Sequence, residues 1–103
     1  MPITLRDKDL KTLRAVFARF PRMQDVRVFG SRAIGAARRT SDIDLAITAP
    51  RMTATEWAEL REAIDEAPIV YKIDVVRLDT LQDEKLKHKI MKEGIVLDTK
   101  AER

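Results

Sequence analysis

The feature that most constrains the fold is one continuous run, GSRAIGAARRTSDIDLAI, at residues 30–47. It begins with Gly30 and Ser31 directly after the β-branched and aromatic segment 26–29. It ends on an alternation in which Ile43, Leu45 and Ile47 occupy every second position, which is typical of a strand with one apolar face. The run therefore predicts a strand, a tight turn and a second strand, with Pro50 closing the second strand.

A helix is predicted before this run, over residues 6–19. Its apolar residues recur at steps of three and four, as on one buried helix face; they are Leu10, Leu13, Val16, Phe17 and Phe20. Thr4 and Asp7 resemble a capping pair, and Pro21 ends the helix. A short helix is also predicted to begin at the Gly30–Ser31 turn and to continue to Ala37, because this segment consists of small, helix-tolerant residues.

The pattern of helix and strand continues after Pro50. Thr53 and Glu56 form a capping box, which predicts an amphipathic helix that ends near Pro68. Residues 69–78 are predicted as a mostly buried strand, although an acidic residue in its middle requires a partner there.

The C-terminal segment predicts a last helix. Thr80 is expected to cap it and Gly94 to end it, and residues 95–97 form either a short strand or a packed tail. The predicted order is helix, strand, short helix, strand, helix, strand, helix. This order indicates one α/β (α+β) domain over residues 1–103, with a small mixed sheet against which the helices pack.

Composition excludes several classes of function. The 20 Lys and Arg residues and 17 Asp and Glu residues are interspersed, so direct nucleic-acid binding is not expected. The chain has no cysteine and one histidine, His88, which excludes disulfides, Cys-ligated zinc and a histidine-rich metal site. Early charges at Arg6 and Asp7 exclude a signal peptide, and no segment approaches the ~20 apolar residues of a membrane span. We therefore expect a cytoplasmic protein that does not bind membranes.

Two carboxylates mark the start of the second strand. Asp42 and Asp44 lie two residues apart, so both side chains are expected on one strand face, where they repel each other unless a cation lies between them. Such hard oxygen ligands suit Mg²⁺. Asp74, on another strand, could supply a third carboxylate, and three acids would fit two magnesium ions ~3.5–4 Å apart for phosphoryl or nucleotidyl transfer.

The Gly30–Ser31 turn complements the acids. Glycine allows a phosphate to approach the backbone closely, and the free N–H groups at the following turn attract anions. The Ser31 hydroxyl adds a donor, while Arg32, Arg38 and Arg39 could neutralise triphosphate charge.

Each of these features has an ordinary structural interpretation as well. The loop lacks the Gly-Lys-Ser/Thr ending of a P-loop and the third glycine of a dinucleotide fingerprint, and residues after Asp42 do not fit an EF-hand. Taken alone, Asp74 is nearly as consistent with an ion pair to Lys72 or Arg77 as with a metal, and single arginines are usually solvated.

Taken together, Gly-Ser, ten residues and Asp-x-Asp resemble the signature of the DNA polymerase β-type nucleotidyltransferase superfamily. The run at residues 30–47 closely resembles the minimal nucleotidyltransferases (MNT) of the antitoxin type. The N-terminal helix, YKIDVVRLD and KHKIMKEGIVLD extend the resemblance over nearly the whole chain. One difference is Ile34, where members of this group often carry a second arginine.

The resemblance implies a catalytic role and a partner. Asp42, Asp44 and Asp74 match the catalytic, metal-binding acids, and Gly30 and Ser31 match the residues that hold the phosphates of ATP; Arg32 matches an arginine with a phosphate or substrate role. The implied activity is Mg²⁺-dependent transfer of AMP from ATP onto a tyrosine of a HEPN-domain toxin.

Two other functions remain open at this point. One is a non-catalytic antitoxin that masks its partner sterically, and the other is a nucleotidyltransferase that acts on a small molecule or an RNA end. Whether the protein is a homo-oligomer or a hetero-oligomer is also open.

Overall fold

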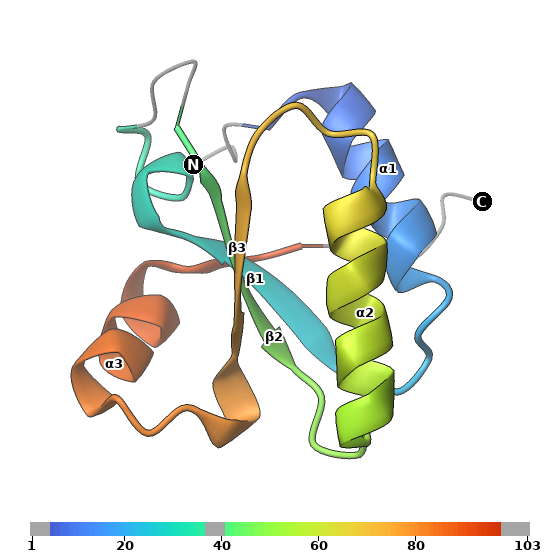
Figure 1. Ribbon diagram of the computed structural model, residues 1–103. Helices are drawn as coiled ribbons and strands as arrows, with labels where there is room; N and C mark the ends of the chain where they lie inside the picture. The colour runs from blue at the N-terminus through green and yellow to red at the C-terminus, as the bar shows by residue number, and fades with distance from the viewer. Residues whose placement is uncertain (1–4, 37–40, 98–103) are drawn as a thin grey trace.

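The computed structural model describes residues 5–36 and 41–97 and shows helices on both faces of a small sheet (Figure 1). The sheet has four strands in the order β3-β2-β1-β4. Their bounds are β1 Asp25–Phe29, β2 Ile43–Thr48, β3 Ile73–Arg77 and β4 Ile95–Val96. The predicted α/β (α+β) class is confirmed.

The strands pair in both directions. β1 is antiparallel to β2 and to β4, whereas β2 and β3 are parallel. Parallel neighbours need a crossover connection, and helix α2 (Ala54–Glu66) supplies it. β3 and β4 are thereby left at the two edges of the sheet.

The larger core lies where α1 (Asp7–Phe17) and α2 cover one face of the sheet (Figure 1). Its fully buried side chains include Leu13, Val28, Leu45, Leu60 and Ile64. Burying one such side chain contributes about 1.5–3 kcal/mol, so this face supplies most of the apolar stabilisation.

Helix α3 (Glu84–Glu93) covers the opposite face only in part. Ile90 from α3 packs there with Phe29, Ala46 and Leu78 in a smaller cluster. The rest of this face is free to carry polar side chains.

Most of the predicted elements are present, with two corrections at helix ends. The short helix expected through Ala37 is only the 3-10 turn η1 (Gly30–Arg32), because Gly35 adopts a left-handed φ of 76° that a helix cannot continue through. Thr80 lies in the 3-10 turn η2 (Leu78–Thr80), and the side chain of Asp83 caps α3 instead, accepting from Leu86 N at 3.1 Å. Thr4 lies outside the described residues, and Arg6 precedes α1 without a side-chain cap.

The strand predicted over residues 69–78 is shorter than expected. It forms only from Ile73 to Arg77, because Ile69 N donates to Ala67 O in a tight turn and Leu78 begins η2. Gly94 ends α3 with a φ of −69°, since the chain continues directly into the extended strand β4, which confirms the strand alternative for residues 95–97.

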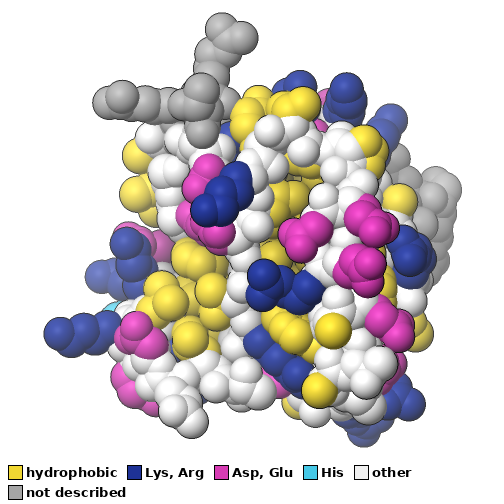
Figure 2. Space-filling model, in the orientation of Figure 1, with side chains coloured by type: hydrophobic (Ala, Val, Ile, Leu, Met, Phe, Trp, Pro, Cys, Tyr) yellow, Lys and Arg dark blue, Asp and Glu magenta, His cyan; other side chains and the backbone are white. Residues whose placement is uncertain are grey.

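The charged side chains of both signs are interspersed in space as they are along the sequence (Figure 2). Figure 2 shows acidic and basic side chains side by side over one face of the molecule rather than a patch of one sign. In the part of the chain that the structure describes, no helix is long and apolar enough to cross a membrane.

Candidate active site

The register of the sheet brings two of the predicted acids together. Asp44 on β2 pairs with Phe29 on β1 and with Asp74 on β3. Directly paired residues project from the same face of a sheet, so the Asp44 and Asp74 side chains lie side by side on the face that α3 partly covers. Two acids thirty residues apart in the sequence thus become neighbours.

Gly30 lies directly against this pair. Its φ of +72° is left-handed, and a Cβ built on it would lie 2.5 Å from Oδ2 of Asp44. The turn that follows is closed by a hydrogen bond from Ala33 N to Gly30 O at 3.0 Å. The Gly30–Ser31 turn is therefore in contact with the Asp44 carboxylate, and only glycine permits that approach.

The pKa of Asp44 is raised above its ordinary value. Burial is the main cause, and the negative charges of Asp74 and Asp42 add to it, while Arg32 and Lys89 oppose it. The ionised form of the Asp44 carboxylate is consequently disfavoured when no cation is bound beside it. A bound cation would reverse this penalty.

Asp42 and Asp74 are less enclosed than Asp44. Asp42 is exposed and lies just before β2, so it flanks the strand on which it was predicted. The Asp74 side chain is 48% exposed and its Oδ1 lies 3.7 Å from Nζ of Lys72. Of the two ion pairs considered for Asp74, the one with Lys72 forms, whereas Arg77 pairs with Asp79 at 3.2 Å.

The donor set at these positions fits Mg²⁺ chemically, since carboxylate oxygens are its usual ligands. Within residues 5–36 and 41–97, however, no three acidic or imidazole side chains are close enough together to hold a metal ion. Binding by all three acids would require Asp74 to turn away from Lys72, which is a small cost because a half-exposed pair contributes about 0–1 kcal/mol.

Arg32 is buried within the loop rather than directed to solvent. It is 4% exposed, its Nε lies 3.2 Å from the carbonyl oxygens of both Ser41 and Asp42, and its Nη2 also donates to Ser41 O. The expected phosphate role of Arg32 stays a prediction. Arg38 and Arg39 lie outside the described residues.

Two further residues near the acids were not found from the sequence. Tyr71 lies under the Arg32 guanidinium, and Lys89 on α3 is close enough to affect the Asp44 charge. Tyr71 is the only tyrosine of the chain and comes three residues before Asp74, which is the only sequence signal it carries.

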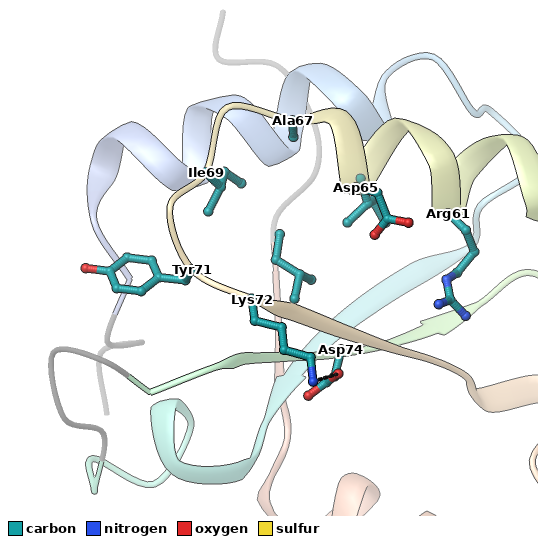
Figure 3. Close-up of a pocket in the computed structure, with 9 residues that line it drawn as sticks. Arg61, Asp65, Ala67, Ile69, Tyr71, Lys72 and Asp74 are labelled. Atoms are coloured by element: carbon teal, nitrogen blue, oxygen red, sulfur yellow. Dashed lines mark ion pairs between the residues drawn. The ribbon is translucent and has the colours of Figure 1, made fainter.

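A pocket of about 310 Å³ opens beside Asp74 (Figure 3). Figure 3 shows Arg61 and Asp65 from α2 on one side, with Lys72 and Asp74 at the start of β3 on the other. Ile69 and Tyr71 from the connecting loop complete the lining. The pocket is mixed in charge and reaches Asp74 from the α2 side of the sheet, opposite to the face from which Asp44 and Asp74 project.

The chain is similar to a known protein family. A family model described as Polymerase beta, Nucleotidyltransferase matches residues 11–103. No curated protein sequence matches the chain.

Solved structures share the fold. One described as a toxin–antitoxin with AMP-PNP has a TM-score of 0.63 and 23% identity, covering 85% of this chain and 71% of the other. A mutant of the MntA–HpeT toxin–antitoxin has a TM-score of 0.66 and 23% identity, covering 92% and 73%. A putative nucleotidyltransferase from Sulfolobus solfataricus has a TM-score of 0.54 and 22% identity, covering 85% and 74%.

Proposed function

The chain belongs to the polymerase β nucleotidyltransferase family, and we propose that it is the antitoxin of a toxin–antitoxin pair that transfers AMP from ATP onto a tyrosine of a HEPN-domain toxin. The observation that carries this proposal is the side-by-side placement of Asp44 and Asp74 against the Gly30–Ser31 turn. The likeness to toxin–antitoxin structures supports the choice of a protein partner.

Each group has a defined part in the proposed reaction. Asp42, Asp44 and Asp74 would hold Mg²⁺, which when bound neutralises triphosphate charge and lowers the barrier to attack. The Gly30 backbone and the Ser31 hydroxyl would orient the triphosphate.

The acceptor hydroxyl would lose its proton toward the Asp74 carboxylate as its oxygen attacks the α-phosphorus. The bond from that phosphorus to the bridging oxygen breaks, and pyrophosphate leaves. Holding the acceptor in line with this bond would supply much of the rate, because orientation can remove about 7–11 kcal/mol of a barrier.

The test is transfer of label from ATP to the candidate toxin. With Mg²⁺, label at the α-phosphate should appear on the toxin and label at the γ-phosphate should not, which separates nucleotidyl transfer from phosphoryl transfer. Asp42→Asn and Asp44→Asn should abolish labelling. Asp7→Asn, which alters an exposed acid on α1, should not.

Other results would favour the alternatives. If no label reaches the toxin while Asp44→Asn still neutralises it, the protein is a steric antitoxin. If label reaches RNA or a small molecule without any protein partner, the acceptor assignment is wrong.

A further inference from the structure

Arg32 makes an unusual set of contacts for an arginine in a loop. Asp9 and Arg32 are the buried charged residues of the part of the chain that the structure describes. A buried guanidinium is costly unless its donors are satisfied, and Arg32 directs Nε and Nη2 at the main-chain carbonyls of Ser41 and Asp42. These carbonyls belong to the two residues that lead into β2. Arg32 therefore fixes the backbone on which Asp42 and Asp44 are carried.

Tyr71 supports the same guanidinium from the other acidic strand. The Arg32 guanidinium carbon lies 4.5 Å from the centre of the Tyr71 ring, within the range of a cation–π contact. The Arg6 guanidinium lies over the same ring at 5.2 Å. Tyr71 is half-buried and lies two residues before β3, the strand that carries Asp74.

Arg6 lies just before α1 and is itself held in place by a residue of that helix. It donates from Nε and Nη2 to the fully buried Asp9 carboxylate, at 2.8 and 3.0 Å. The contacts thus run from α1 through Arg6, Tyr71 and Arg32 to the entrance of β2.

We propose that Arg32 and Tyr71 are positioning residues for the metal-binding acids. Their stacked contact joins the segments that enter β2 and β3 and keeps the Asp42, Asp44 and Asp74 carboxylates at a fixed separation. This inference rests on the proposed function, since it assigns those acids to a metal. It differs from a phosphate-binding role for Arg32, because Nε and Nη2 of Arg32 donate to the protein backbone.

Measuring metal binding without nucleotide distinguishes a positioning role for Arg32 from a phosphate-binding role. Mn²⁺ affinity can be measured by electron paramagnetic resonance on nucleotide-free protein, and ATP affinity by a fluorescent analogue in EDTA. Arg32→Lys keeps the charge but loses the planar fork. It should weaken Mn²⁺ binding by about 10-fold or more, as loss of a partner behind a metal ligand typically does, and leave metal-free ATP affinity within about twofold.

Tyr71 provides an independent variant in case Arg32→Lys fails to fold. Tyr71→Phe keeps the ring and should bind Mn²⁺ like the wild type, while Tyr71→Leu should weaken it. The double variant Arg32→Lys/Tyr71→Leu should lose less than the sum of the single losses, because the two residues act through one contact. Arg22→Lys, at an exposed arginine paired with Glu56, is the control and should change nothing.

The inference is overturned if Arg32→Lys weakens metal-free ATP binding and leaves Mn²⁺ affinity intact, which would make Arg32 a phosphate ligand. It is also overturned if Tyr71→Leu binds Mn²⁺ like the wild type. Failure of the proposed function has a different signature: the wild type would bind Mn²⁺ in an Arg32-dependent way but transfer no nucleotide. A wild type that binds no Mn²⁺ would overturn both.

Discussion

Replacing Gly30 with alanine tests the contact between the turn and the Asp44 carboxylate. The added Cβ would lie 2.5 Å from Asp44 Oδ2, whereas ordinary van der Waals contact begins near 3.4 Å. The carboxylate must therefore move by about 0.9 Å. The left-handed backbone of a non-glycine residue costs a further 1–2 kcal/mol or so.

These magnitudes predict different effects on stability and on activity. A loss of about 1–2 kcal/mol leaves a domain of typical stability, about 5–15 kcal/mol, almost fully folded. A displacement of about 1 Å at a reacting centre, in contrast, can cost about 100-fold in rate. Urea titrations should therefore show that Gly30→Ala is still folded in the absence of urea. Its rate of toxin labelling should nevertheless fall about 100-fold.

Gly35→Ala is the matched control for backbone strain. Gly35 is exposed and also left-handed, with a φ of 76°, so its substitution should cost similar stability and little activity. Removing the carboxylate with Asp44→Ala should reduce the stability loss caused by Gly30→Ala, because the clash disappears. The reasoning is refuted if Gly30→Ala retains full activity, or if Gly35→Ala is equally inactive.

Three other predictions concern charge and capping. Burial and neighbouring acids raise the pKa of Asp44, so the folded protein loses stability as pH rises from the ordinary pKa of an aspartate, about 4, to the raised pKa. Asp44→Asn should therefore raise the melting temperature at pH 7 in EDTA, and the gain should vanish below about pH 4. Equal melting temperatures at pH 7 would contradict this. Thr53→Ala removes the side chain that accepts from Glu56 N at 3.1 Å and should lower the free energy of unfolding in urea by about 1 kcal/mol. No measurable loss would show that the capping box contributes nothing. Lys72→Met removes the cation that pairs with Asp74 and should raise Mn²⁺ affinity by at most about fivefold, since an exposed pair is worth no more than about 1 kcal/mol; weaker binding would show that Lys72 does not compete with the metal.

Local signals in the sequence predicted much of the fold. The alternation around Leu45 became β2, and Thr53 with Glu56 forms both hydrogen bonds of a capping box. These predictions succeeded because period and capping depend on residues close together in the chain.

Element ends were harder to predict, because competing signals lie close together. Thr80 and Asp83 are both good caps, and the choice between them depended on how η2 packs against the smaller core. Gly35 was itself a signal that the short helix would stop, because glycine adopts a left-handed φ at little cost, but the prediction of a helix to Ala37 did not use it.

The candidate site was predicted as a list of residues but not as an arrangement. The pairing of Asp44 with Asp74 depends on strand register across the α2 crossover, which no short pattern encodes. The burial of Arg32 is also nonlocal, since its acceptors lie nine and ten residues further along the chain. Asp74 pairs with Lys72 rather than with Arg77, because residues two apart on an extended segment share a face and residues three apart do not.

The site depends on the parallel register of β2 and β3, so enzymatic activity also indicates that the chain has folded in the correct register. A slip of one residue would bring Ile73 or Val75 opposite Asp44 and turn Asp74 toward the helices α1 and α2, because side chains alternate between faces. A misregistered molecule would thus lose an acid from the site and gain a charge in its core. Since pairing across a long crossover is slow compared with local structure, a newly made chain would bring its two acids together only after its helices have formed.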